Sequence, residues 1–357
     1  MKILTVVGAR PQFIKAAVLS RLIAEDPELE EVLVHTGQHF DAAMSDVFFD
    51  HMDIHPPNYH LEVNSLSHGA MTGRMLEKIE EVLFVEQPDV VLVYGDTNST
   101  LAGALAAQKL HIPVAHVEAG LRSFNMKMPE EVNRILTDRI STFLFTPTKT
   151  AVKHLEAEGF ASFNSQVILV GDIMLDAALY YADRSNDKAK IDFEIKDHFI
   201  LCTLHRAENT DDPRRLSEIV RALNDLHKEM EVVLPLHPRT KKMLEQHGID
   251  LNVHTIAPLG YFEMITLLKS CSLVMTDSGG LQKEAYFFKK PCLTLRDETE
   301  WTELVENGFN ALAGADYSQI IRMSREMINK TLDFSMDLYG DGNAGRKILK
   351  KLKEAIA

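Results

Sequence analysis

The chain has 357 residues, of which 45% are hydrophobic and 25% are charged, and its formal net charge at pH 7 is -14. Its length exceeds the size at which one hydrophobic core usually keeps growing, so we expect two domains. The acidic balance argues against nucleic-acid binding, which needs basic side chains to neutralise phosphates, and no apolar run approaches the roughly 18 residues that span a membrane. The three cysteines, Cys202, Cys271 and Cys292, are widely spaced, and we expect buried thiols in a cytoplasmic protein.

Short β-branched runs alternate with helical patterns from the start of the chain. In the first half we expect strands at 2–8, 31–37, 90–96, 113–120 and 142–148. After a polar stretch at 182–197 the pattern restarts, and we expect strands at 199–205, 231–239, 253–259, 272–280 and 291–297. Regular alternation of strand and helix is typical of a doubly wound parallel sheet. The predicted fold class is therefore α/β, with two Rossmann-like domains facing a cleft.

Carboxylates stand at successive strand ends and at one helix start in the first half: Asp96, Glu118 and Glu130. In an open parallel sheet, side chains that follow the carboxyl ends of the strands converge on one crevice. Carboxylates gathered there can provide a general base and a general acid in one pocket. We interpret them as proton-transfer groups acting on a bound sugar or similar polyol. The alternative is helix capping, since Asp96 precedes a helical run and Glu130 opens one.

Two turns have the composition of anion-binding sites. In the first, Gly8 ends a strand, Arg10 lies in the turn and Lys15 follows in the helix, an arrangement that suits an anionic group. This turn matches neither the dinucleotide fingerprint nor the nucleoside triphosphate P-loop. In the second, residues 278–280 separate a strand from a helix, where their backbone N–H groups would hold a diphosphate.

Further polar residues stand near the second turn. Glu284 lies one helical turn beyond it, where a carboxylate would accept both hydroxyls of a ribose; the alternative is an exposed helix residue. His205, Arg206 and His237 end predicted strands and add donors around the same crevice. The usual sequence patterns of zinc proteases and serine hydrolases do not occur, so we expect chemistry from acids and bases.

The last residues, 345–357, form a basic run with an apolar stripe at helical spacing: Ile348, Leu349, Leu352 and Ile356. Such a stripe usually packs on its own protein, which is our prediction. The alternative is a helix that lies on a membrane surface.

A series of spaced motifs covers nearly the whole chain in this order: GARPQFIK, TGQH, YGDTNST, HVEAGLR, PEEVNR, HRAEN, TDSGGLQKEA and RDETE. Together they resemble the non-hydrolysing UDP-N-acetylglucosamine 2-epimerase family. The resemblance implies a glycosyltransferase-B type fold: an N-terminal domain at 1–170 with the acid/base residues, a UDP-binding domain at 171–335, and a helix at 336–357 that returns to the first domain. It also implies a UDP-sugar substrate, a homodimer, and no required metal or other cofactor.

The chemistry of that family accounts for the carboxylates. No carbonyl adjoins C2 of a pyranose, so its hydrogen is not acidic, and epimerisation needs either transient oxidation or loss of the anomeric leaving group. Because the sequence has no dinucleotide-binding motif, we expect elimination of UDP to a glycal and its re-addition. Carried over by motif, Asp96, Glu118 and Glu130 are the acid/base groups and Lys15 orients or tunes them. The residues implied to hold UDP, and to stabilise it as it departs, are Arg10, His205, Arg206, His237, Ser278, Gly279, Gly280 and, on the ribose, Glu284.

The segment SFNMKMPEE differs from that of relatives that act on UDP-N-acetylglucosamine. With GDTNSTLAGALAA and RDETEWTEL, it is more similar to the branch that converts UDP-2,3-diacetamido-2,3-dideoxyglucuronic acid to its manno epimer for surface polysaccharide such as O-antigen. Lys127 or Asn125 would then meet the C6 carboxylate, although Lys127 also fits a solvated loop. After TGQH, the family commonly has a charged residue and an amide, whereas this chain has Phe40 and Asp41. This difference argues against a second, activating substrate site.

Other functions remain open on the sequence. A UDP-N-acetylglucosamine 2-epimerase would give UDP-N-acetylmannosamine. A hydrolysing epimerase would release free UDP, and a retaining glycosyltransferase would need an acceptor. A non-catalytic UDP-sugar-binding protein would bind without exchange at C2.

Overall fold

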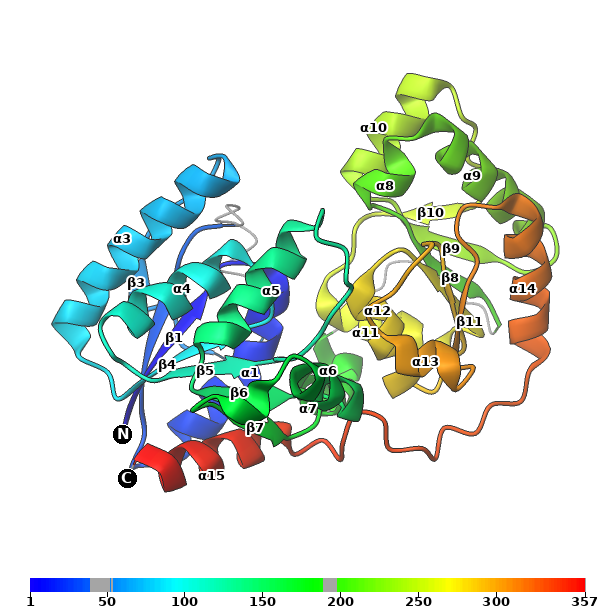
Figure 1. Cartoon of the computed structure of the whole chain (residues 1–357). Helices are drawn as coiled ribbons and strands as arrows, with labels where there is room; N and C mark the ends of the chain where they lie inside the picture. Colours follow the sequence, from blue (N-terminus) through cyan, green and yellow to red (C-terminus); the bar gives the residue numbers. More distant parts are fainter. Residues whose placement is uncertain (39–51, 53, 189–197, 357) are drawn as a thin grey trace. The chain divides into compact units, whose positions relative to one another are not determined.

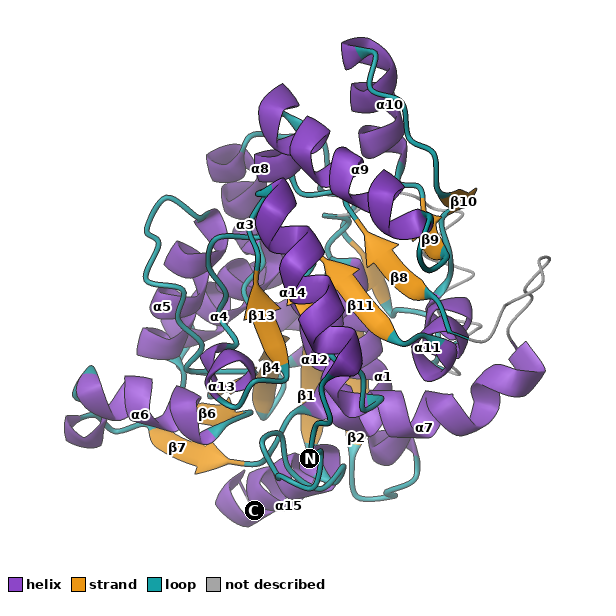
Figure 2. Cartoon of the chain, turned by 90° about the vertical axis from the view of Figure 1, so that its right-hand side faces the viewer, coloured by secondary structure: helices purple, strands orange, loops and turns teal. Residues whose placement is uncertain are grey.

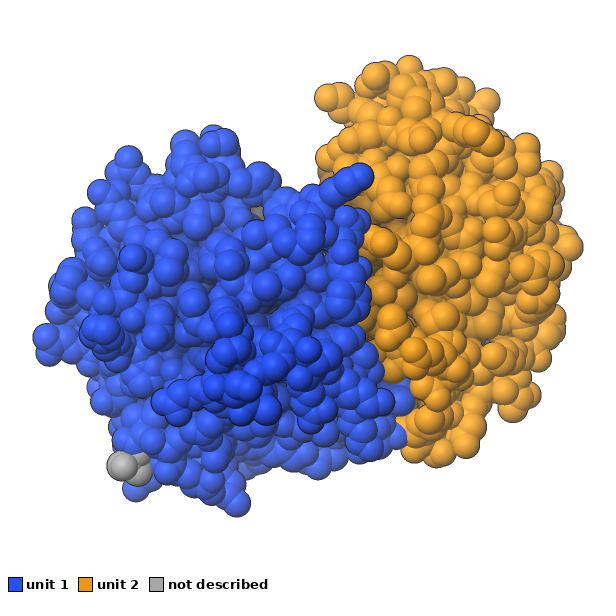
Figure 3. Space-filling model, viewed as in Figure 1, with its two compact units in different colours: residues 1–177, 337–357 blue, residues 178–336 orange. Residues whose placement is uncertain are grey.

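The computed structural model describes residues 1–38, 52, 54–188 and 198–356. Two compact units make up the chain, and Figure 3 colours them separately: residues 1–177 with 337–357, and residues 178–336. Each unit contains one parallel sheet with helices between its strands (Figure 1). The predicted α/β class with two Rossmann-like domains is therefore confirmed. In the part of the chain that the structure describes, no helix has both the length and the apolarity needed to cross a bilayer.

The first unit has a seven-stranded parallel sheet in the order β3-β2-β1-β4-β5-β6-β7. The strands are β1 (Lys2–Val7), β2 (Glu30–His35), β3 (Tyr59–His60), β4 (Val90–Tyr94), β5 (Val114–Val117), β6 (Phe143–Thr146) and β7 (Gln166–Leu169). All five residues of β4 are buried, because helices cover both faces of a parallel sheet and leave no wet side.

Most helices of the first unit connect one strand of its sheet to the next. They are α1 (Arg10–Ala24), α3 (His68–Glu86), α4 (Asn98–Lys109), α5 (Pro129–Ile140), α6 (Lys149–Ala157), the short η1 (Phe160–Ser162), the start of α7 (Ile173–Lys188), and α15 (Ala344–Ile356). Right-handed crossovers place α1 on one face of the sheet and α3, α4 and α5 on the other. Apolar residues of α3 and α4 pack against β1, β2 and β4 to form one core cluster.

The C-terminal helix α15 packs on the first unit. Ile348, Leu349 and Leu352 are buried, and α15 lies against α1 so closely that a Cβ atom on Gly345 would stand 2.8 Å from a methyl carbon of Leu22. The prediction that the apolar stripe packs on its own protein is confirmed.

The second unit has a six-stranded parallel sheet in the order β10-β9-β8-β11-β12-β13. Its strands are β8 (Ile200–Thr203), β9 (Val232–Pro235), β10 (His254–Ile256), β11 (Leu273–Thr276), β12 (Cys292–Thr294) and β13 (Asn310–Leu312). Its helices are α8 (Ala207–Thr210), α9 (Pro213–His227), α10 (Pro238–His247), α11 (Tyr261–Ser270), α12 (Gly279–Phe287), α13 (Thr302–Glu306) and α14 (Tyr317–Asn329). Figure 2 shows α9 and α14 on the face of this sheet that is turned toward the viewer.

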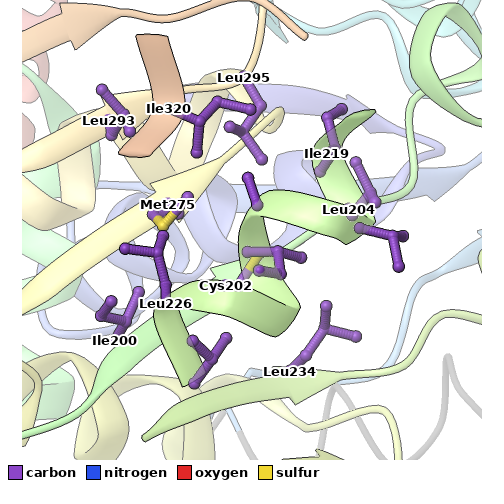
Figure 4. Packing of buried hydrophobic residues seen from close by; sticks show 14 of the residues in the cluster. Ile200, Cys202, Leu204, Ile219, Leu226, Leu234, Met275, Leu293, Leu295 and Ile320 are labelled. Carbon is purple, nitrogen blue, oxygen red and sulfur yellow. The ribbon is translucent and has the colours of Figure 1, made fainter. Parts of the chain in front are cut away.

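Between this sheet and helices α9 and α14 lies a tightly packed apolar core. Figure 4 shows Cys202 of β8 and Met275 of β11 among the side chains that α9 and α14 contribute. All three cysteines are buried and free, as predicted. Burial disfavours the thiolate and raises the pKa of the Cys271 thiol to about 12, so these thiols serve packing and not chemistry.

Candidate active site

Several of the predicted site residues stand at the switch points of the two sheets. Connections leave β1 and β4 in opposite directions, as they leave β8 and β11, and open α/β sheets bind ligands where the strand order reverses in this way. Lys15 lies in the helix after β1 and Asp96 follows β4. In the second unit His205 follows β8 and Ser278 follows β11. Each unit thus presents its polar residues where its sheet favours a ligand.

The turn after β1 is held by Gln12. Its side-chain oxygen accepts from the backbone N–H groups of Gly8 and Ala9 at 2.8 and 3.0 Å, and its amide nitrogen donates to the Tyr94 carbonyl at 2.9 Å. Gly8 has no room for a side chain, since a Cβ atom there would lie 2.1 Å from the Thr36 hydroxyl. The turn is therefore fixed to the end of β4. The backbone of Arg10 begins α1, and its side chain lies outside the described residues.

Lys15 and Glu118 form a buried ion pair. The Lys15 ammonium lies 2.5 Å from Glu118 Oε1, and each side chain is 9% exposed. Glu118 has a φ of 72°, a left-handed conformation that a residue with a side chain adopts at a cost in strain. Strain of this kind collects at functional sites. Lys15, which we expect to orient or tune the carboxylates, thus contacts Glu118.

Asp96 faces a buried arginine. Its carboxylate accepts from Arg134 Nη2, and Nη1 of the same guanidinium donates to Glu131 at 3.0 Å. Asp96 does not cap α4, because Thr97 is the N-cap and accepts from the Thr100 N–H at 3.2 Å. The capping alternative for Asp96 is wrong. Its side chain remains 28% exposed, which leaves it accessible to a substrate.

The neighbouring glutamates 130 and 131 have different surroundings. Glu131 is fully buried and accepts from the backbone N–H groups of Ser123 and Phe124 at 2.9 and 2.8 Å. Glu130 is the second residue of α5 and half-buried, and it makes no hydrogen bond or ion pair with the residues that the structure describes. The N-cap of α5 is Met128. Glu131 therefore anchors the preceding loop, and Glu130 is available for chemistry.

The loop before α5 carries Asn125 and Lys127, the two residues predicted to meet a C6 carboxylate. Lys127 is exposed, and its backbone N–H donates to the Asn125 side-chain oxygen at 3.1 Å. The oxygen of the Asn125 amide is thus engaged within the loop, while the Lys127 ammonium lies at the surface.

In the second unit, Asp277 joins the two turns that flank the switch point. It is fully buried, directly precedes Ser278, and accepts from the backbone N–H groups of His205 and Arg206 at 3.0 and 2.9 Å. His205 Nδ1 lies 3.3 Å from the same carboxylate. Burial lowers the pKa of His205, although the charge of Asp277 opposes this shift. Asp277 was not among the predicted site residues, because nothing in the motif indicates which side chain faces inward.

The turn after β11 corrects one expectation. The backbone N–H of Ser278 donates to the Thr276 hydroxyl at 2.9 Å, so it is not presented to a ligand, because the hydroxyl of the last strand residue already satisfies it. Ser278 is the N-cap of α12. The N–H groups of Gly279 and Gly280, at the start of that helix, find no partner among the described residues, and they remain the candidate anion donors.

Arg206 and Glu300 approach this turn closely. A Cβ atom on Gly279 would lie 2.4 Å from Glu300 Oε1 and 3.8 Å from Arg206 Nη2. The Gly279 carbonyl accepts from the Trp301 indole at 3.0 Å. A side chain at Gly279 would therefore require the Glu300 carboxylate to move, and the guanidinium of Arg206 stands beside this position.

The two remaining predicted residues of the second unit are Glu284 and His237. Glu284 is 8% exposed, so the alternative of an exposed helix residue is wrong. His237 is the N-cap of α10, and its Nδ1 accepts from the Arg239 N–H at 3.1 Å. The His237 ring centroid lies 5.7 Å from that of His205. His237 thus combines a capping role with a position near the other predicted donors.

Comparison with known proteins covers nearly the whole chain. The family model described as UDP-N-acetylglucosamine 2-epimerase matches residues 21–353. The UDP-2,3-diacetamido-2,3-dideoxy-D-glucuronate 2-epimerase of Pseudomonas aeruginosa is 56% identical over 353 residues, 99% of each chain. A UDP-N-acetylglucosamine 2-epimerase of Methanococcus maripaludis is 43% identical over 98% of this chain and 97% of its own length.

Solved structures agree with the sequence comparison. The crystal structure of the Methanocaldococcus jannaschii UDP-GlcNAc 2-epimerase, in complex with UDP-GlcNAc and UDP, matches with a TM-score of 0.90 at 39% identity. The match covers 99% of this chain and 100% of that one. The predicted glycosyltransferase-B type of fold is thereby confirmed.

Proposed function

The chain belongs to the UDP-N-acetylglucosamine 2-epimerase family, and on that premise we propose that it inverts C2 of UDP-2,3-diacetamido-2,3-dideoxyglucuronic acid to give the manno epimer. The observation that carries this choice of substrate is the 56% identity, over 99% of both chains, to the Pseudomonas aeruginosa enzyme of that name. The chain is thus a UDP-sugar 2-epimerase, an isomerase, as the motifs predicted.

We propose that the reaction proceeds by elimination and re-addition. A base removes the C2 proton while the bond between C1 and the UDP oxygen breaks, and the electron pair of the C–H bond forms the double bond of a glycal. A proton then returns to C2 from the other face and the UDP oxygen attacks C1. Asp96, Glu118 and Glu130 share these proton transfers, with Lys15 orienting Glu118. Two observations support these roles. The side chains of Asp96 and Glu130 are partly exposed, and Lys15 and Glu118 form a buried ion pair.

We propose that the second unit holds UDP. The N–H groups of Gly279 and Gly280 and the guanidinium of Arg206 would meet the diphosphate, with the Ser278 hydroxyl, His205 and His237 adding donors. Glu284 would bind the ribose, and Arg10 remains a predicted diphosphate contact. Negative charge grows on the diphosphate as the C1–O bond breaks, so donors fixed beforehand stabilise the transition state more than the bound substrate.

The close contact at Gly279 makes a sharp test of the diphosphate site. In Gly279→Ala the new methyl group would lie 2.4 Å from Glu300 Oε1. Glu300 is held by an ion pair with the buried Arg296 at 3.1 Å, so we expect the turn to shift and its N–H groups to lose their alignment. We expect UDP to bind roughly 10- to 100-fold more weakly by calorimetry, the range for a lost hydrogen bond to a charged group. Gly73→Ala on α3 is the matched control, because a Cβ atom there meets nothing within 4 Å. Equal UDP affinity in both variants would contradict this site.

His205 gives the site a pH dependence. Its pKa is lowered from 6.5, mainly by burial, so the ring is neutral at pH 7, and a diphosphate beside it would favour the imidazolium. Binding then takes up a proton, so UDP affinity increases as pH falls below the raised pKa of His205 in the complex, and it levels off below the pKa of free His205. Calorimetry of UDP binding between pH 5 and 8 checks this against His205→Asn, which also controls for titration of UDP itself. Identical pH profiles for the two proteins would exclude His205 from the diphosphate site.

We also propose a homodimer in the cytoplasm that contributes to surface polysaccharide synthesis. The dimer is supported by apolar side chains at the end of α3, where Phe84 and Val85 are 62% and 73% exposed. The cytoplasm is supported by the free thiols, which persist in reducing compartments. Light scattering should give twice the mass of one chain, and a monomer at micromolar concentration would contradict the dimer.

The choice of substrate is tested by product analysis. With UDP-2,3-diacetamido-2,3-dideoxyglucuronic acid we expect the UDP-linked manno epimer, at a kcat/KM at least about 100-fold above that for UDP-N-acetylglucosamine, since a site built for the polar groups of one sugar rejects another that lacks them. The reverse preference would assign the chain to the other substrate. Free sugar with free UDP would indicate a hydrolysing enzyme, turnover only with an acceptor a transferase, and binding without turnover a non-catalytic protein.

A further inference from the structure

His116 lies inside the first sheet with both ring nitrogens engaged. It is on β5, two residues before Glu118, and is fully buried. Its Nε2 lies 2.7 Å from the Gly95 carbonyl oxygen, and its Nδ1 lies 2.7 Å from Asp138 Oδ1. A carbonyl oxygen can only accept, so Nε2 donates to Gly95. That bond holds the residue directly before Asp96.

Asp138, which contacts His116 Nδ1, also contacts Gly120 and Arg122. It is a fully buried residue of α5, and its Oδ2 accepts from the Gly120 N–H at 3.1 Å and from Arg122 Nη1 at 2.7 Å. Arg122 in turn pairs with Glu158 through Nε and Nη2 at 2.6 and 2.8 Å. Burial alone would raise the pKa of Asp138, but the hydrogen bond and charge of His116 and the charge of Arg122 hold it below its ordinary value. Asp138 thus joins His116, Gly120 and Arg122 through its two carboxylate oxygens.

These contacts join the three segments that carry the acid/base candidates. Through His116, Asp138 holds the turn after β4, which leads into Asp96. Directly, it holds Gly120 in the turn after β5, two residues beyond Glu118. It belongs itself to α5, whose first turn carries Glu130.

The two turns held in this way are conformationally demanding. Gly95 and Glu118 have φ values of 62° and 72°, and a Cβ atom on Gly95 would lie 3.3 Å from the Lys15 ammonium. A backbone shift at Gly95 would therefore displace the ion pair of Lys15 with Glu118 as well as Asp96. The hydrogen bond from His116 restrains this position from inside the sheet.

We propose that His116 and Asp138 are positioning residues for epimerisation, which fix the turns of Asp96 and Glu118 against the helix of Glu130. This inference rests on the proposed function. Neither residue touches the substrate, so both act through the carboxylates that they place. A misplacement of about 1 Å in such groups costs on the order of 100-fold in rate.

Two amide substitutions separate the two hydrogen bonds of His116. In His116→Gln the amide nitrogen can take the place of Nε2 and keep the bond to Gly95. In His116→Asn it can take the place of Nδ1, keeping the bond to Asp138 while losing Gly95. We expect kcat to fall on the order of 100-fold in His116→Asn and clearly less in His116→Gln, while the KM and the UDP affinity change less than about threefold in both.

His55→Asn is the matched control, because His55 also pairs with one carbonyl, that of Pro56 at 2.9 Å, and one carboxylate, that of Glu31 at 3.2 Å. Melting temperatures are measured for all variants. A kcat that follows melting temperature alike in both His116 variants, or a folded His116→Asn with wild-type kcat, would overturn the inference. Failure of the wild-type chain to epimerise any UDP-sugar would instead overturn the proposed function, and this inference with it.

Discussion

Asp96→Asn and Glu130→Gln are each expected to reduce kcat about 10³-fold while UDP binds with unchanged affinity. An amide cannot take up or release the proton, and general acid or base catalysis contributes roughly 10²- to 10⁴-fold. Both side chains belong to the first unit, whereas most of the proposed UDP contacts belong to the second. Turnover is measured by NMR of the UDP-sugar epimers and UDP affinity by calorimetry.

Glu131→Gln is the contrasting variant for this prediction. Glu131 is buried and holds the backbone of Ser123 and Phe124, so its substitution should lower the melting temperature, because charge-assisted hydrogen bonds are weakened. Glu130→Gln should leave the melting temperature unchanged. Normal turnover in both Asp96→Asn and Glu130→Gln would remove these residues from the mechanism.

Lys15→Met is expected to impair stability and catalysis together. The ammonium lies 2.5 Å from Glu118 Oε1, and both side chains are only 9% exposed. Breaking a buried pair leaves an uncompensated charge, which costs about 3–5 kcal/mol. We expect the free energy of unfolding of the first unit to fall by about 3 kcal/mol, and kcat to fall at least about 100-fold, since Glu118 loses the group that orients it.

The double variant Lys15→Met with Glu118→Gln separates the two effects. It removes both charges, so no buried carboxylate is left unpaired, and stability should recover relative to Lys15→Met alone. Turnover should stay low because Glu118 is missing. Lys149→Met, an exposed lysine on α6, serves as the control. Wild-type stability and kcat in Lys15→Met would show that the pair has neither role.

Much of the fold could be predicted because it follows from local patterns. Buried parallel strands are short apolar runs, and β4, with five buried residues, is one of them. Candidate residues at strand ends could be named for the same reason, since the sheet topology places them at one edge. The return of α15 to the first unit could not be predicted from local patterns, because an apolar stripe indicates burial but not the surface that it covers. Only the family resemblance implied it.

The partners of the candidate residues could not be predicted, because they come from distant parts of the chain. Nothing local distinguishes Glu130 from Glu131, since the packing of α5 decides which carboxylate faces inward. Arg134 and Asp277 act through contacts that no motif spacing reveals. The backbone N–H of Ser278 was assigned wrongly for a related reason: a hydroxyl of the preceding strand already satisfies it.

Exchange of the C2 hydrogen with solvent tests the central claim most directly. The full chain is incubated with UDP-2,3-diacetamido-2,3-dideoxyglucuronic acid in heavy water, and C2 of the UDP-linked sugars is followed by NMR. Removal of the C2 proton and its return from the other face predict deuterium at C2 of the manno epimer, with the sugar still joined to UDP. A manno epimer that retains hydrogen at C2, or no epimer at all, would contradict the account.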